Sequence, residues 1–459
     1  MQKFVRFVLL VAIFSIPFGT DLFVAQFEGR AHLPGFQEFS SFFVYGIEIL
    51  VLVACLVLVF AGRRNKNVLE EEKEMTHDLV LPGLFLLFAL SSFGLAVSPA
   101  GLILFFRLLL AVSFSGVVTV FLRSKIVSFA DLAGTVATSA LFQGVLGIVQ
   151  FARQQSVGLW FLGESYVDFW TTGVGRVFSD GGRLLRSFGT MPHANVYAAF
   201  LVLGLAALFY FFLKEDEKKF SIKRVVLSFG ILILFCALLF SFSRSGWIGV
   251  GVLIVSVLGL AASTPSLRFR SWVLLLRLVA IGALVMIAFG HLAVPRATIS
   301  LKNDASFNYR LTYNEIGWET IKENPLGVGL GNQVYHGVAA GLYQQQGIGE
   351  KETWNWQPIH NLYLLAASEA GIPALLALLV VLVTLGARTL QTFWRNRNEY
   401  PVAHVCIAGV FAAFLVLGLS DHYFWDLVSG RLMFWFLLGI MMGLSPNLSA
   451  SETGNRRAI

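Results

Sequence analysis

Residues able to do chemistry crowd into one stretch of the chain, residues 308–373, which lies between two long apolar segments. Arg310 opens a segment that we predict to be an amphipathic helix over residues 308–323, and the turn ENPLGVGLGN follows it. Proline and glycine favour a tight turn with exposed backbone amides. The glycine spacing is weak evidence for dinucleotide binding, because no strand and βαβ helix flank it. We interpret the turn as a shaped loop, with Asn332 as a candidate substrate-binding residue.

His360 stands where this polar stretch ends and an apolar helix begins. A lone histidine is more often structural than catalytic. At a helix N-terminus, however, the dipole disfavours protonation, and a neutral imidazole can accept a proton from a hydroxyl. A phosphate nearby would favour the charged ring instead, so the resting state stays open. The next residue, Asn361, is a second candidate for substrate binding.

Arg244 lies in SFSRSG, between two apolar runs. An arginine there can lie at the interface between membrane and water, with its side chain extended so that the charged group contacts water. Its neighbours Ser241, Ser243 and Ser245 favour another interpretation, because small hydroxylated side chains leave room for a ligand. A guanidinium matches phosphate with two parallel hydrogen bonds.

A further polar segment, RLLRSFGTMPHAN, precedes an apolar run. Its candidate substrate-binding residues are Arg183, Arg186, His193 and Asn195. A set of membrane-entry residues with a helix cap is an equally good interpretation of this segment.

The composition places these motifs in a membrane protein. Of the 459 residues, 56% are hydrophobic and 13% charged, and the mean hydropathy is +0.73. These values exclude an ordinary soluble protein. The formal net charge of +7 arises largely from short basic clusters beside apolar runs, which indicates membrane orientation and not nucleic-acid binding. The three cysteines lie in apolar runs without metal-ligand spacing.

Twelve segments have the length and apolar character of a membrane span, which needs about 20 residues. They are residues 4–20, 40–61, 79–97, 102–122, 126–151, 193–213, 225–242, 247–263, 271–292, 359–390, 402–419 and 430–446. Cytoplasmic loops carry the excess of lysine and arginine. With Lys3 and Arg6 inside, the even-numbered loops carry most of the basic residues, as this rule requires. The pattern predicts an all-α membrane protein of twelve helices with both termini cytoplasmic.

We expect residues 1–459 to form one polytopic domain with two long extracytoplasmic loops, residues 152–192 and 293–358. Within the first, residues 157–170 are a candidate interfacial helix. Both loops, and the turn at Arg244, keep arginine on the side where orientation alone would remove it. A local role, such as binding an anionic substrate, explains this better.

Four motifs together resemble those of the O-antigen ligase and O-antigen polymerase superfamily. They are RSFGTMPHAN, SFSRSG, KENPLGVGLGN with the preceding Arg310, and PIHNLYLLAASEAGIP, and they cover roughly residues 180–375. The resemblance implies a GT-C type glycosyltransferase of the bacterial cytoplasmic (inner) membrane, with its site facing the periplasm or cell exterior. Members move a glycan from a polyprenyl-diphosphate carrier to a hydroxyl of a glycan, lipid or protein.

By motif, the resemblance implies that Arg244 and Arg310 bind the diphosphate and that His360 is a base or orients the acceptor. Ligation to lipopolysaccharide, polymerisation and transfer to protein all remain open. We expect no metal or other cofactor, because the outer acidic pairs, Asp21 with Glu28 and Asp421 with Asp426, lack convincing spacing. Arginine would supply the positive charge instead.

The alternative is a transporter or flippase for a lipid-linked or anionic solute. Such a protein should hold its polar residues near the bilayer midplane, in two related halves. The polar residues here gather at one face and no repeat is evident, which favours an enzyme.

Overall fold

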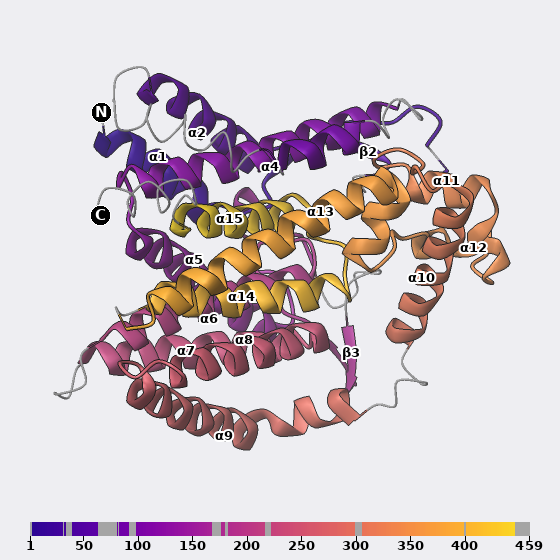
Figure 1. Cartoon of the computed structure of the whole chain (residues 1–459). Helices are drawn as coiled ribbons and strands as arrows, with labels where there is room; N and C mark the ends of the chain where they lie inside the picture. The colour runs from indigo at the N-terminus through magenta and orange to yellow at the C-terminus, as the bar shows by residue number, and fades with distance from the viewer. Residues whose placement is uncertain are drawn as a thin grey trace.

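The computed structural model of the chain is dominated by α-helices (Figure 1). It describes residues 2–30, 32–33, 39–62, 80, 82–90, 98–167, 176–179, 182–215, 222–298, 305–398 and 401–445. Within these ranges, seven helices are long and apolar enough to cross a membrane. They are α4 (Pro99–Arg123), α5 (Phe129–Arg153), α6 (Ala194–Lys214), α7 (Ile222–Phe240), α8 (Arg244–Ala262), α9 (Arg268–Thr298) and α13 (Leu362–Arg395).

Within the same ranges, three shorter apolar helices accompany them, α2 (Gly46–Gly62), α14 (Val402–Gly418) and α15 (Val428–Leu444), and α1 (Gln2–Phe14) precedes them in the chain. The prediction of an all-α polytopic protein is therefore confirmed, while the count of twelve spans stays a prediction. The expected third span, residues 79–97, lies partly outside the described residues.

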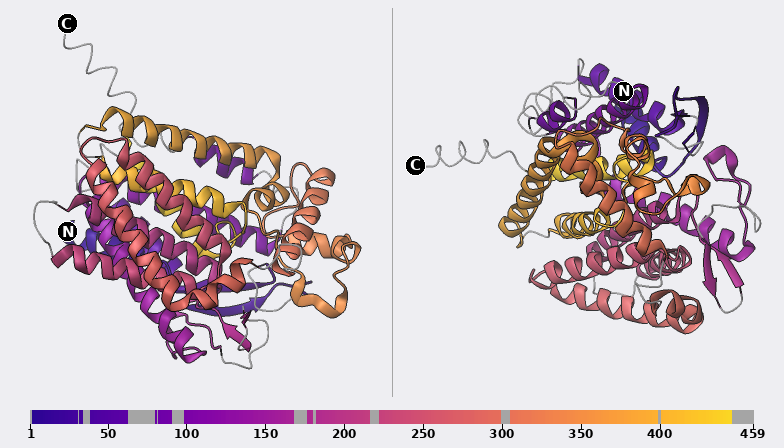
Figure 2. Two further views of the ribbon diagram at one scale, coloured as in Figure 1. Left: turned by 90° about the horizontal axis from the view of Figure 1, so that it is seen from below. Right: turned by 90° about the vertical axis from the view of Figure 1, so that its right-hand side faces the viewer.

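The expected span 40–61 was wrong at its start. Residues Ser41–Tyr45 form strand β2, which pairs antiparallel with β1 (Asp21–Gln26). The sequences DLFVAQ and SFFVY are rich in aromatic and β-branched residues, and such residues pack well on a pleated strand. Figure 2 shows this hairpin beside the helices, apart from the second hairpin of β3 (Arg176–Ser179) and β4 (Gly182–Leu185).

The interfacial helix expected over residues 157–170 is wrong for the part that the structure describes. Residues 157–167 contain only the single 3-10 turn Trp160–Leu162. The carboxylate of Glu164 accepts hydrogen bonds from the amides of Val157, Gly158 and Leu159 at 2.6, 2.8 and 2.6 Å. These amides therefore bond to the carboxylate and not to the carbonyls of a regular helix. The chain folds around Glu164 as a result.

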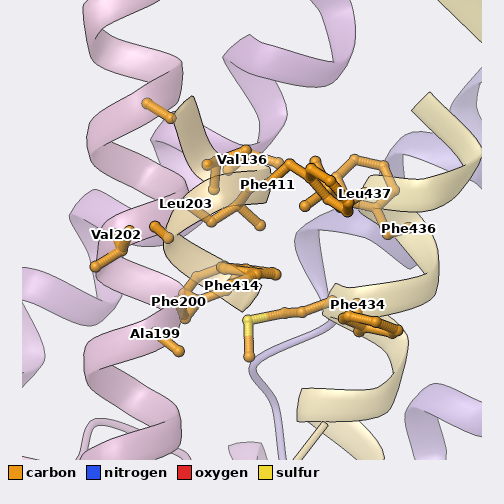
Figure 3. Close-up of a cluster of buried hydrophobic side chains, with 14 of the residues drawn as sticks. Val136, Ala199, Phe200, Val202, Leu203, Phe411, Phe414, Phe434, Phe436 and Leu437 are labelled. Atoms are coloured by element: carbon orange, nitrogen blue, oxygen red, sulfur yellow. The ribbon is translucent and has the colours of Figure 1, made fainter. Parts of the chain in front are cut away.

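Helix α6 is the centre of the bundle. It is apolar on every side and almost all its residues are buried, which is how such a helix is stabilised inside a protein. In Figure 3, Phe200 and Leu203 of α6 lie beside Phe411 and Phe414 of α14, and Phe434 of α15 belongs to the same buried cluster. Helix α9, in contrast, exposes large apolar residues such as Ile287. This outer surface is suited to contact with lipid.

The long segment between α9 and α13 folds into short helices at one end of the bundle. They are α10 (Ala305–Glu323), α11 (Gln333–Ala339), α12 (Leu342–Gln345) and the 3-10 helix Glu350–Asn355. In Figure 1 this group lies at the end of the bundle opposite α1. A small core of its own, which includes Tyr313, Tyr343 and Trp356, holds the group together. Helix α10 confirms the helix predicted over residues 308–323.

The glycine-rich turn after α10 packs against a break in helix α13. Gly371 has φ +86°, so the helix is interrupted there, just before Pro373. The amides of Val328 and Gly329 donate to the carbonyls of Ser368 and Glu369 at 2.9 and 3.0 Å, and Ile372 donates to Pro325 at 2.9 Å. The expectation of exposed amides is therefore wrong for Val328 and Gly329. The turn supplies hydrogen-bond partners for backbone groups of the broken helix. Such groups need partners within the protein, because lipid hydrocarbon offers no hydrogen bonds.

Candidate active site

The site forms where several helices start or stop at the same end of the bundle. Helices α6, α8 and α13 begin there, α14 ends there, and α10 packs against α13. Helix N-termini carry partial positive charge and unpaired amides, which favour an anion. Each of the three N-termini is capped by a polar side chain, His193 before α6, Ser243 before α8 and Asn361 before α13.

Asn195, in the first turn of α6, connects three segments of this site. Its Oδ1 accepts hydrogen bonds from Nη2 of Arg186 at 2.7 Å and from Oγ of Ser243 at 3.0 Å. Arg186 also donates from Nε to the carbonyl of Ser241 at 2.7 Å. The segment before α6 is thereby fixed to the SFSRSG turn that starts α8 and places Arg244 at the same end of the bundle.

Asp421, in the loop after α14, is the acidic partner of this network. Its Oδ2 accepts from Nδ2 of Asn195 at 2.6 Å and lies 3.6 Å from Nη2 of Arg310. Arg310 also donates from Nε to the carbonyl of Ser420 at 3.0 Å. Burial opposes ionisation of Asp421, but the surrounding groups of His360, His422 and Arg310 lower its pKa below the usual range. Asp421 is therefore an anion that ties α6, α10 and the α14–α15 loop together.

His360 lies directly before α13 and its ring is held on two sides. It stacks on Tyr313 with ring centroids 5.1 Å apart, and its Nδ1 lies 2.9 Å from the carbonyl of Pro358. A carbonyl only accepts hydrogen bonds, so Nδ1 carries the proton and Nε2 the lone pair. Burial lowers the pKa of His360 to about 4, and the charge of His422 acts in the same direction. The ring is neutral at pH 7 and able to accept a proton.

A second histidine, His422, stands beside His360. The two ring centroids are 4.7 Å apart and the rings are nearly perpendicular. Its Nδ1 lies 2.7 Å from Oδ2 and 2.8 Å from Oδ1 of Asp426. Burial acts against a charged ring, but the carboxylates of Asp426 and Asp421 raise the pKa of His422 to about 9. The site therefore pairs a neutral imidazole with a charged one.

Four arginines surround these groups. Burial lowers the pKa of Arg186 to about 9, and the charges of Arg296, Arg310 and Arg244 act in the same direction, while Asp421 opposes them. Guanidinium groups that repel one another at short range are stabilised by a shared anion. Arg296, at the end of α9, was not among the predicted site residues. Its signal in the sequence was an arginine beside Pro295, at the predicted outer end of an apolar run.

The remaining predicted residues hold the edges of the site. His193 caps α6, its Nδ1 accepting from the amide of Asn195 at 3.1 Å. Asn361 caps α13 by accepting from the amides of Tyr363 and Leu364 at 2.9 and 3.1 Å. Such caps shape the chain whether or not they also bind a substrate.

Arg183 and Asn332 are not among the contacts that join Arg186, Asn195 and Asp421. Arg183 is exposed on strand β4. Asn332 is buried at the start of α11, where it accepts hydrogen bonds from Arg30 and from Oγ of Ser98, the latter at 2.9 Å. Its amide connects the β1–β2 segment and α4 to the glycine-rich turn. A substrate-binding role for either residue stays a prediction.

Sequence reasoning missed Asp421, His422 and Asp426 as site residues. They belong to SDHYFWD, in a predicted outer loop without lysine or arginine. The available signal was a histidine between two acids on the predicted side of the arginines. Their closeness to Asn195, 226 positions away from Asp421 in the sequence, depends on how α6 and α14 pack.

One group of side chains here has the types that bind metal ions. One ligand atom each of His360, Asp421 and His422 lies within 4.8 Å of the others. The charge of the surroundings is unfavourable to a cation, because Arg310 already contacts Asp421 and Asp426 holds the ring of His422 in its charged form. Metal ligation requires a neutral imidazole.

Membrane-length helices with a cationic site at one end define a polytopic membrane protein. Within it, residues 229–379 match the family model Wzy_C, described as O-Antigen ligase, and this match supports the resemblance to the O-antigen ligase and polymerase superfamily. No curated protein matches the chain. The match contains Arg244, Arg310 and His360, and ends before Asp421. Together with the apolar helices, it indicates a multi-pass protein of a bacterial inner membrane with O-antigen ligase-like glycosyltransferase activity.

Proposed function

We propose that this protein transfers a glycan from a polyprenyl diphosphate to an acceptor hydroxyl, at the end of the bundle where α6, α8 and α13 begin. The observation that carries the proposal is the neutral His360 set beside Arg310 and the other cations. A transfer of this kind needs a base for the acceptor and positive charge for the leaving group. Both requirements are met within one contiguous group of side chains.

In the proposed reaction, Arg310 and Arg244 bind the two phosphates of the donor. The acceptor oxygen attacks the anomeric carbon, and the bond between that carbon and the phosphate oxygen breaks. The proton of the acceptor hydroxyl goes to Nε2 of His360, whose Nδ1 stays bonded to Pro358. The lipid diphosphate leaves with the electron pair, and the guanidinium groups stabilise its additional charge.

We propose that the reaction needs no metal ion. Divalent metals in glycosyl transfer neutralise the leaving diphosphate, and the arginines provide that charge here. Excess EDTA should leave the rate unchanged, and added Mg²⁺ or Mn²⁺ should not increase it. A rate that falls with EDTA and recovers with a metal would contradict this, and would favour ligation by His360, Asp421 and His422.

The site is proposed to face the periplasm or cell exterior. This orientation follows from the basic residues at the other helix ends, such as Arg268 and Arg270 at the start of α9. The starts of α6, α8 and α13 then share the outer side with α10.

The decisive experiment is transfer by purified protein from a defined polyprenyl-diphosphate glycan. Acceptors would be a lipid A core oligosaccharide, a second copy of the donor, and a serine- or threonine-containing peptide. A new glycosidic bond to one of them is the expected result and identifies the product. Movement of the donor across a liposome membrane without any bond formed would instead favour a flippase.

A further inference from the structure

The carboxylate of Asp421 is bracketed by two cations from different segments. Nη2 of Arg310 lies 3.6 Å from one carboxylate oxygen, Oδ2. Nε2 of His422 lies 3.8 Å from the other, Oδ1. Both distances exceed a normal hydrogen bond, so each cation has donor capacity left for a further anion.

Asp426 fixes the ring of His422 in one orientation. Both carboxylate oxygens of Asp426 lie within 2.8 Å of Nδ1, and this nitrogen therefore carries a proton. In the part of the chain that the structure describes, Nε2 of His422 has no hydrogen bond, and it points at the carboxylate that Arg310 also faces. The side chain is only 13% exposed, so its charge is little screened by water.

We propose that His422 is a donor-binding residue, whose Nε2–H binds a phosphate oxygen of the leaving diphosphate beside Arg310. Asp426 is its positioning residue. Asp421 holds the two cations in place in the free protein, and the diphosphate contacts them from the side that Asp421 leaves open. This inference rests on the proposed function, because it assigns His422 to the leaving group of that reaction.

A catalytic base is the other role that a histidine–carboxylate pair can play. The groups facing His422 do not favour it. Asp426 and Asp421 support the charged ring and outweigh burial and the charge of Arg310, while His360 is neutral. A ring that is already protonated at pH 7 donates a hydrogen bond and cannot accept a proton. The neutral ring beside it, His360, is better suited to be the base.

The test measures binding of farnesyl diphosphate to the full-length protein in detergent, by calorimetry at pH 7 and pH 10. The variants are His422→Gln, which keeps a neutral donor, and Asp426→Asn, which keeps the ring but removes its anchor. The matched control is His404→Gln, at the other end of α14, where His404 faces the carbonyl of Leu444. Farnesol, which lacks phosphate, serves as the control ligand.

At pH 7, His422→Gln and Asp426→Asn should each weaken binding by about tenfold, the lower range for a hydrogen bond to a charged group. The wild type and His422→Gln should bind equally at pH 10, because the ring loses its charge as the pH rises through about 9. Arg186 titrates in the same range, so only the difference between the two proteins reports on His422. His404→Gln should bind like the wild type.

Equal affinity of the wild type and His422→Gln at pH 7 would overturn the inference. So would a defect of the same size at both pH values, which indicates a structural effect, or binding of farnesol as tight as that of farnesyl diphosphate. The outcome is separate from that of the proposed function. A wild type that binds farnesyl diphosphate in this manner but transfers no glycan to any acceptor would refute the proposed function only.

Discussion

At the scale of single residues, the site is a balance between several fixed cations and few anions. Asp421 is the anion shared by most of them, with Asn195 on one oxygen and the charged groups of Arg310 and His422 around it. Two imidazoles 4.7 Å apart have opposite protonation states, because only one of them has a carboxylate at Nδ1. The local partner decides the role of each histidine.

Replacing His360 tests its assignment as the base. His360→Ala should lower the transfer rate by about 10²- to 10⁴-fold, the usual effect of losing a positioned base. In the wild type, the rate should stay level from pH 7 down to about 5 and fall through about pH 4, as the ring becomes protonated. Initial rates at saturating donor measure both effects. A loss of activity centred near pH 6.5 would show that the ring is not held neutral.

Replacing Arg310 tests the binding of the diphosphate. Arg310→Ala should lower kcat/KM by about 10²- to 10³-fold, comparable with removing one donor to a developing oxyanion. Lys322→Ala, on the same helix, is the matched control, because Lys322 is exposed and pairs with Glu319 of the same helix at 2.8 Å. Its activity should be normal. Equal activity of the two variants would refute the role of Arg310.

Residue types and motif order predict Arg244, Arg310 and His360 as site residues, and this assignment stays a prediction. They are not enough to predict Asp421 or His422, because a short acidic turn between two spans has no distinctive spacing. The significance of that turn comes from long-range packing, which puts it against α6 and α10. Similarly, Asn332 has the residue type of a ligand-binding residue, but its amide is used to hold Arg30 and Ser98.

At the scale of elements, the motifs ENPLGVGLGN and SEAGIP are two halves of one packing unit. The break at Gly371 leaves backbone groups of α13 without helical partners, and the glycine-rich turn supplies them. The turn connects α10 to α11, and α13 begins two residues after His360. This unit therefore helps to hold α10, which carries Arg310, against α13, which follows His360. The sequence predicted the turn, but not that its amides were used within the protein.

Gly327 is the position where this packing is tightest. It has φ +89°, and a Cβ added there would lie 2.4 Å from the carbonyl oxygen of Glu369. Gly327→Ala should lower the stability by about 2–4 kcal/mol, the left-handed backbone cost together with an overpacking cost. Gly347→Ala is the control, because Gly347 has φ +80° and open space around it. It should cost about 1–2 kcal/mol, from the backbone alone. Thermal unfolding in detergent compares the two, and equal losses would contradict the packing unit.

At the scale of the whole molecule, the apolar helices let the chain place one polar site at one end of a bundle. The centre of the bundle, around α6, α14 and α15, is buried in protein, and outer helices such as α9 present apolar side chains to their surroundings (Figure 3). The sequence predicted most of these helices, because an apolar run of this length is typical of a membrane-spanning helix. It could not predict which helices are central, since all of them are similarly apolar.

The orientation of the bundle gives the last prediction. If the site faces outward, α12 is outside and the turn between α8 and α9 is cytoplasmic. In a parent protein with its three cysteines replaced, Gln345→Cys should react with a membrane-impermeant maleimide in intact spheroplasts. Ser266→Cys, also at an exposed position, should react only after permeabilisation. The parent alone measures background labelling. The reverse pattern would show that the proposed orientation is wrong and that the site faces the cytoplasm. The polyprenyl-linked donor would then have to react before its export.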